Sequence, residues 1–475
     1  MPNISLNLRT LTLAAMMAVS AANAQDLKPS LVASRTIGTA PLFVHFDATA
    51  TTSKNVPDPF RQVLYTFDYG DSAAGNWVTT GKARGIKAGG PIGAFVFERP
   101  GTYTVRMVAN DGRHSDERRI TITVLDPDIV YAGEATVCIS TDGSTGWGPA
   151  GAAYVTGIPE KSTWNGKRLM FKRGQDFSSE NAISVTGGAA NFQLCASEGT
   201  DAKPILPAVG IGDSRPPAGT EIWPTNIALI DLNFPAGFSI GAAGQHHLAL
   251  RCDAPNGTQI SFGWSIYYMF DDPYQYVPID QWPVPKYHAL VECTFPGDQA
   301  TAYYNIFSDG CSHAAILGCT MEQAVYHNLR LTQAYKTLVA DSAFKGQSPS
   351  SSYHCVKVHS GSLAPYAEPL TSGSKFWATR YVVAQHNIVG SAACTYAWLT
   401  AFCPQNPASE EGVQDVLVLG NTFIRSADGQ VDVVMGGSRI TTLDNTTQGG
   451  SFTTAVGHDE ALPAGWKGPY YTSRA

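Results

Sequence analysis

The sequence predicts an all-β protein in two parts, a β-sandwich followed by a parallel β-helix. In the first part, short runs alternate apolar and polar residues between glycine, proline and aspartate, which is typical of packed β-strands. In the second part, one short apolar phrase recurs at intervals that suit the coils of a solenoid. Only 15% of the 475 residues are charged, and 46 glycines and 29 prolines supply the turns that many short strands require.

The first residues are typical of a secretory signal. Arg9 precedes an apolar run over residues 11–19, and the chain then reaches the small-x-small sequence of residues 22–24. The run is too short to cross a bilayer, so residues 1–24 are predicted to be a signal peptide that is cleaved after Ala24. The alternative is a hydrophobic N-terminal strand. No later segment is apolar enough to span a membrane, so we expect a secreted protein, extracellular or periplasmic.

Residues 27–126 contain the alternating runs of the predicted sandwich. In YTFDYGD, residues 65–71, Tyr65 and Phe67 are expected to face its core. In PGTYTVRMVANDG, residues 100–112, the inward residues are expected to be Tyr103, Val105 and Met107. These motifs resemble the PKD domain, an immunoglobulin-like module of exported bacterial proteins. The resemblance covers about 100 residues and implies a spacer or a weak binding module without catalytic activity.

The recurring phrase of the second part places one variable residue after a short apolar run and an apolar residue two positions later. Examples are ALVECTF, AILGCTM and VLVLGNTF. We call the variable position the slot, and it is held by Leu232, Cys252, Cys293, Cys319, Ser342, Asn387 and Asn421. The slots are separated by 20, 41, 26, 23, 45 and 34 residues. The shorter spacings suit one coil of a parallel β-helix, and the longer ones leave room for an insertion or an extra coil.

The slot predicts that Cys252, Cys293 and Cys319 are buried thiols stacked in successive coils. Cysteine, serine and asparagine all suit a tight turn with the side chain pointing inward. A disulfide framework and a metal site are the two alternatives, although no cysteine or histidine pair has the usual ligand spacing. The nine cysteines include Cys394 and Cys403, which we expect to be the best candidates for a local disulfide.

Three further motifs lie in the second part of the chain. They are NGKRLMFKRGQDF at 165–177, AQHNIVG at 384–390 and VLGNTFI at 418–424. These phrases resemble those of the pectate-lyase-like superfamily of right-handed parallel β-helices, in particular its asparagine-bearing turns. The resemblance covers residues 127 to about 445, and the β-helix with its terminal caps is assigned to 127–475. This fold serves lyases, hydrolases, esterases, tailspikes and adhesins, so it does not specify the chemistry.

The resemblance also implies a substrate groove along one sheet, lined by outward side chains of stacked strands. Alternating apolar residues set the inward face of the strands that follow the slots. The outward row predicted in this way is Ser261, Asn305, Arg330, Lys357, Trp398 and Asp432. Thr332 and His359 lie two positions further along their strands.

The predicted row suits an acidic polysaccharide. The indole of Trp398 can stack on a sugar ring, and Arg330 and Lys357 can bind the carboxylate of a uronic acid. Asn305 and Asp432 are further predicted substrate-binding residues. Lys357 and His359 are the catalytic candidates, because a lyase needs a base that removes the proton next to the carboxylate. The alternative is that these residues form ordinary solvated surface.

Some expected features of related enzymes are missing from the row. It has no cluster of acidic residues like that with which pectate lyases hold Ca²⁺, and the closely placed aspartates of polygalacturonases are absent as well. We therefore expect no cofactor and assign no metal ligand, and Ca²⁺ stays an alternative for which no ligand cluster is identified. The formal net charge of −7 and the lack of a basic run argue against a nucleic-acid partner. The aromatic segment Phe270–Tyr287 is predicted to be an insertion that lines a groove or contacts another protein.

Two functions fit these observations. The first is an exported protein that recognises a polysaccharide and cleaves it as a lyase or glycoside hydrolase. The second is a non-catalytic surface, matrix or adhesin protein in which the β-helix is a rigid scaffold associated with a cell surface. The row of Arg330 and Lys357 favours the first function, and the missing acidic cluster favours the second.

Overall fold

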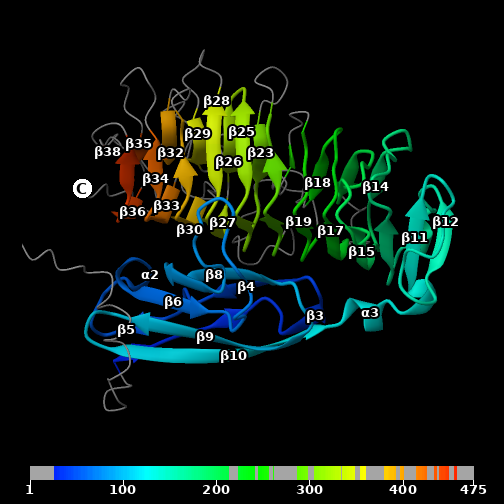
Figure 1. The fold of residues 1–475 in the computed structure, drawn as a ribbon. Coiled ribbons are helices and arrows are strands. Elements are labelled where there is room, and N and C mark those ends of the chain that lie inside the picture. Colours follow the sequence, from blue (N-terminus) through cyan, green and yellow to red (C-terminus); the bar gives the residue numbers. More distant parts are fainter. Residues whose placement is uncertain are drawn as a thin grey trace, which may run out of the picture.

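The computed structural model shows a β-sandwich lying against the side of a long β-helix (Figure 1). It describes residues 26–456 apart from 213–222, 241–243, 256–259, 262–285, 298–303, 333, 348–353, 360–378, 392–395, 401–412, 425–432, 436–437 and 449–453. The predicted signal peptide, Cys394, Cys403 and most of the Phe270–Tyr287 segment lie outside these residues. Within them, no helix is long and apolar enough to cross a membrane.

The sandwich is built from two main sheets, as the sequence predicted. One contains β2 (Val32–Ala33), β4 (Leu42–Asp47) and β8 (Ile92–Phe97). The other contains β3 (Ile37–Thr39), β10 (Ser115–Leu125), β9 (Gly101–Asn110), β6 (Leu64–Asp68) and β7 (Ile86–Gly89). Smaller elements are β1 (Leu27–Lys28), β5 (Thr52–Ser53) and α2 (Pro59–Gln62). Tyr65, Phe67, Val105 and Met107 are fully buried in its core as predicted, whereas Tyr103 is only partly buried.

The β-helix has a twelve-stranded parallel sheet along one side. Its strands in spatial order are β12 (Ala153–Thr156), β11 (Thr136–Ser140), β13 (Arg168–Phe171), β15 (Ala190–Ala196), β17 (Thr225–Ile230), β19 (Leu248–Leu250), β21 (Ala289–Val291), β24 (Ala315–Leu317), β27 (Tyr335–Ala340), β30 (Thr379–Gln385), β33 (Val413–Leu419) and β36 (Ser438–Leu443). The short helices α3 (Pro127–Val130), η2 (Gly133–Ala135) and η3 (Lys161–Thr163) lie near its start.

Two other parallel sheets complete the coils. The six-stranded sheet contains β22 (Thr294–Phe295), β25 (Thr320–Ala324), β28 (Ala343–Gln347), β31 (Ile388–Val389), β34 (Thr422–Ile424) and β37 (Thr446–Gln448). The seven-stranded sheet contains β20 (Ile260–Ser261), β23 (Tyr304–Asp309), β26 (His327–Thr332), β29 (His354–His359), β32 (Tyr396–Thr400), β35 (Val433–Met435) and β38 (Thr454–Val456). A short sheet of β14 (Ile183–Val185), β16 (Val209–Ile211) and β18 (Phe238–Ile240) belongs to the first coils.

The slot residues form the ladder that the sequence predicted. Residues that follow the slots pair in register from coil to coil, for example Thr294 with Thr320 and Thr320 with Ala343. Cys252, Cys293 and Cys319 are fully buried free thiols in successive coils. The residue before each of the seven slots has a positive φ: Asp231, Arg251, Glu292, Gly318, Asp341, His386 and Gly420. A left-handed residue followed by an inward slot therefore makes each corner.

The sandwich packs on the outer face of the twelve-stranded sheet. Phe43, Phe60, Trp77, Ile92 and Val96 of the sandwich share one buried cluster with side chains of the β-helix, among them Leu250, Val291, Leu317, Leu338 and Val383. Figure 1 shows the sandwich, with its strands β4 and β8, lying alongside this sheet. The expectation of a spacer does not describe this arrangement, because apolar side chains of both parts are buried in the contact.

Candidate functional site

Arg330 and Lys357 lie next to each other on the outer side of the seven-stranded sheet, as the sequence predicted. The pairing of β26 with β29 sets Arg330 opposite Lys357. Their strand neighbours Leu329, Val356 and Val358 are fully buried in the core, so alternation directs the two cationic side chains away from it. Adjacent strands are about 4.8 Å apart, which brings two positive charges close together. We call this pair the cationic row.

Like charges on directly opposed residues of neighbouring strands repel each other. Lys357 is only 4% exposed and Arg330 is partly exposed, so the two charges are partly shielded from water. The planar guanidinium of Arg330 is suited to bind a carboxylate with two hydrogen bonds. The cationic row thus combines a partly exposed guanidinium with a nearly buried ammonium.

A second row runs beside the first. The backbone register aligns Asp309 of β23 with Thr332 of β26, and Thr332 with His359 of β29. The predicted alignment of Thr332 with His359 is thus confirmed. Asp309 was missed, although counting two residues on from the position opposite Arg330 would have found it. An aspartate, a threonine and a histidine thus hold equivalent backbone positions on neighbouring strands, two residues along from the cationic row.

Asn305 does not belong to the outward row, so the position predicted for it is wrong. Its side chain is fully buried and donates hydrogen bonds to the carbonyl of Glu322 (2.7 Å) and to Oδ1 of Asn328 (2.8 Å). Alternation fails at this point because Asn305 lies at the corner where the chain enters β23. Phe307 is the residue that pairs with Arg330, and Ser261 pairs with Phe307.

Trp398 is shifted from its predicted place by one residue. The register of β29 with β32 sets Trp398 opposite the core residue Val356, and Leu399 opposite Lys357. The prediction of Trp398 as the next member of the outward row is therefore wrong. Its phase had rested on one residue, Leu399, which the register sets opposite Lys357. Asp432 lies outside the described residues.

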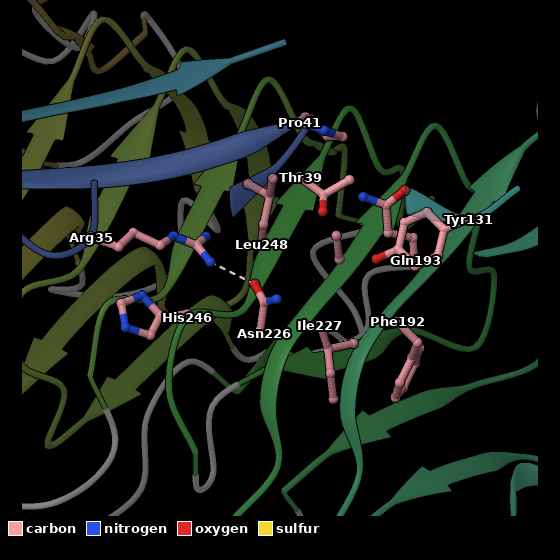
Figure 2. Close-up of a pocket in the computed structure, with 11 residues that line it drawn as sticks. Arg35, Thr39, Pro41, Tyr131, Phe192, Gln193, Asn226, Ile227, His246 and Leu248 are labelled. Carbon is pink, nitrogen blue, oxygen red and sulfur yellow. Dashed lines mark hydrogen bonds between the residues drawn. The ribbon is translucent and has the colours of Figure 1, made fainter. Parts of the chain in front are cut away.

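A small cleft lies between the sandwich and the β-helix (Figure 2). Nη1 of Arg35 donates to Oδ1 of Asn226 (2.6 Å), and Nε2 of Gln193 donates to the carbonyl of Ala40 (2.9 Å). Burial lowers the pKa of Arg35 to about 10. The internal space of about 20 Å³ has room for about one water molecule, so a sugar ring cannot enter it. We therefore regard this cleft as part of the contact between the two parts of the protein.

Among the residues that the structure describes, no group of three histidine, cysteine or acidic side chains is arranged to hold a metal ion. In the seven-stranded sheet, the backbone register aligns Arg330 with Lys357, and Asp309 with Thr332 and His359.

The sandwich matches a known domain family over residues 30–124. It is a PKD domain. No curated protein matches the chain. The PKD match covers the part of the molecule that packs on the twelve-stranded sheet, and both candidate rows lie outside it.

Several solved structures are similar to the chain at low identity. An endo-xylogalacturonan hydrolase from Aspergillus tubingensis is 11% identical, with 62% of this chain and 89% of that chain covered and a TM-score of 0.32. The A-module of a mannuronan C-5 epimerase from Azotobacter vinelandii is 8% identical, with 61% and 88% covered and a TM-score of 0.33. A surface adhesin of Streptococcus pneumoniae is 8% identical, with 61% and 85% covered and a TM-score of 0.25. Similarities at TM-scores this low identify no substrate or reaction for this chain.

Proposed function

We propose that the protein is exported and binds an acidic polysaccharide along the outer side of the seven-stranded sheet. The observation that carries this proposal is the register of Arg330 with Lys357 between two inward apolar positions. A polyuronate presents carboxylates at regular intervals, and two cations on neighbouring strands can each bind one of them. The parallel strands repeat this geometry along the β-helix, which suits a chain-like ligand.

Cleavage of the bound polysaccharide is the second step of the proposal. His359 lies two residues beyond Lys357, and the register aligns Asp309 and His359 with Thr332 between them. An imidazole and a carboxyl can act as base and acid on a sugar whose carboxylate is held by the cationic row. The alternative is a surface or matrix protein that binds the polysaccharide without cleaving it.

Replacement of the cationic row tests the binding site. We expect Arg330→Ala and Lys357→Ala each to weaken binding of a polyuronate by about 1.5–3 kcal/mol, because each removes a charged hydrogen-bond partner. The loss should be smaller at high salt, and a neutral polysaccharide should be affected little. Calorimetric titration measures these affinities.

The matched control is Lys345→Ala. Lys345 is a half-exposed lysine on β28 of the six-stranded sheet, where its ammonium lies 3.8 Å from Glu322. The Lys345→Ala variant should leave the affinity for the polyuronate unchanged. Equal affinity of the double variant Arg330→Ala/Lys357→Ala and the wild type would show that the polysaccharide does not bind to this row.

Catalysis is tested separately from binding, by measuring turnover of the polysaccharide. If His359 and Asp309 perform acid–base chemistry, His359→Gln and Asp309→Asn should abolish turnover while affinity is largely kept. Reducing-end assays, together with the ultraviolet absorbance of an unsaturated product, distinguish hydrolysis from elimination. Binding by the wild type without any turnover would select the non-catalytic alternative.

A further inference from the structure

Two histidines meet at the contact between the PKD domain and the β-helix. His45 lies on β4 and is 1% exposed, and His313 lies at the positive-φ corner before β24 and is 9% exposed. Their ring centroids are 5.3 Å apart in an edge-to-face arrangement. Nε2 of His45 is 2.9 Å from the carbonyl of Lys336, so this nitrogen carries the proton and donates it.

The charged groups that face this pair are mostly cationic. Lys336 contacts His45 through its carbonyl, and its ammonium binds Asp47 at 2.6 Å. The positive charge of Lys87 on β7 lowers the pKa of His45, and that of Lys286 on the β-helix lowers the pKa of His313. Among the described charged groups that change the pKa of either ring, Asp47 is the only acidic one. The uncharged ring of Tyr287 lies 6.3 Å from His45 and 5.1 Å from His313.

Burial keeps both histidines neutral while the domain is docked. It lowers the pKa of His45 to about 4 and that of His313 to about 2, each from 6.5. The carboxylate of Asp47 raises the pKa of both rings, but it is already bound to Lys336. Protonation of both rings would thus add two positive charges beside three lysines, where the one carboxylate, Asp47, is already bound to Lys336.

The direction of the pH effect follows from these shifts. A released histidine takes up a proton at its ordinary pKa of about 6.5, whereas the docked residues stay neutral until about pH 4 or below. Between these values the released state binds more protons, so docking weakens by about tenfold per pH unit for each histidine. Above about pH 7.5, where a released histidine is almost fully neutral, the two histidines contribute little pH dependence.

Other titrating groups lie at the same contact. His246 stacks on Tyr287, and His386 lies 3.9 Å from Asp341; burial lowers the pKa values of these histidines to about 3 and about 4. Like His45, these two histidines weaken docking as the pH falls. Asp341 acts in the opposite direction, because burial raises its pKa to about 7 and its protonation favours the docked state. Burial lowers the pKa of Lys87 to about 7, so its contribution changes mainly above pH 7.

We propose that His45 and His313 form an acid-sensitive latch, which holds the PKD domain on the twelve-stranded sheet at neutral pH and releases it when both rings are protonated. Release would uncover the apolar outer face of this sheet, including Leu250, Val291 and Leu317. The latch is thus a conformational device built into the contact between the two parts of the chain, and it is independent of the proposed polysaccharide site.

Acid titration of the full chain tests the latch. Small-angle X-ray scattering reports the largest dimension of the molecule, binding of an apolar-surface dye reports exposed sheet, and far-ultraviolet circular dichroism reports strand content. Between pH 8 and pH 4 we expect the dimension and the dye binding to rise together below about pH 6. The circular dichroism should stay constant over this range.

The variant His45→Gln/His313→Gln removes the titrating groups, while the glutamine at position 45 keeps an N–H for the carbonyl of Lys336. Its transition should lie about one pH unit lower or be absent. His114→Gln is the matched control, because His114 lies beside Asp111 in the PKD domain, and it should leave the transition unchanged.

Three results would overturn the latch. They are an unchanged dimension and dye binding of the wild type down to pH 4, a loss of circular dichroism in step with release, and an unshifted transition in the double glutamine variant. If that variant does not fold at pH 8, the His45 ring is titrated by NMR in the wild type. A pKa near 6.5 while the domain is docked would then contradict the proposal.

Discussion

At the scale of single residues, the slot shows why one corner accepts cysteine, serine and asparagine. In the C-terminal coils, Oδ1 of each slot asparagine accepts the backbone N–H of the preceding slot residue, as Asn421 does for Asn387 (2.9 Å). Nδ2 of Asn421 donates to the carbonyl of Ala384 (3.1 Å). Ser342 makes a similar contact, since its Oγ accepts from the N–H of Cys319 (3.1 Å). Cysteine fills the same inward position in earlier coils with a small apolar side chain.

The hydrogen bonds between slot residues predict that substitutions in different slots lower the free energy of unfolding by different amounts. Asn421→Ala leaves the N–H of Asn387 and the carbonyl of Ala384 buried without these partners, so the free energy of unfolding should fall by about 1–3 kcal/mol. Cys319→Ser is the matched control, because the neighbouring coil already holds a serine in this slot, and it should cost less. Urea denaturation measures both values. An alanine variant as stable as the serine variant would contradict the role given to the asparagine ladder.

At the scale of elements, the middle strands β19, β21 and β24 of the twelve-stranded sheet are buried on both faces. Ala249, Leu290 and Ile316 point into the core of the β-helix, and Leu250, Val291 and Leu317 point toward the PKD domain. This accounts for the unbroken apolar character of the phrases that lead into the slots. Sheets covered on both faces generally have such continuous apolar strands. The contact is completed by Gly89 and Gly90, which let the turn after β7 approach β30 and β33 closely.

Enlarging Gly90 should disturb this contact. A Cβ at Gly90 would lie 2.7 Å from Leu417 and 2.9 Å from Val383, so Gly90→Val forces the PKD domain away from the sheet. We expect a loss of about 1–3 kcal/mol, as overpacking of a buried site usually costs. Ala88→Val on β7 is the matched control because the side chain of Ala88 is exposed. Thermal unfolding compares the two, and equal melting temperatures would argue against tight packing at Gly90.

At the scale of the whole molecule, the features predicted correctly from the sequence are those that depend on local periodicity. The recurring slot identified the coils, and the phase of Leu329 and Val356 placed Arg330 beside Lys357. Asn305 was misplaced because alternation says nothing about a corner, where a buried amide satisfies carbonyl groups of a neighbouring strand. The docking of the PKD domain was not predicted, because Leu250 or Val291 looks the same in sequence whether a loop or another domain covers it.

The docked arrangement predicts that the two parts of the chain behave differently when they are produced as separate fragments. The PKD domain has its own buried core around Phe46, Phe67 and Val105, so a fragment of residues 26–126 should fold alone. A fragment of residues 127–475 would expose the apolar face that the domain covers, and we expect it to bind an apolar-surface dye and to self-associate. Adding the first fragment should suppress both effects, because it restores the native contact. Analytical ultracentrifugation and circular dichroism measure these outcomes. A β-helix fragment that is monomeric and binds no dye would show that the outer face of the twelve-stranded sheet does not need its cover.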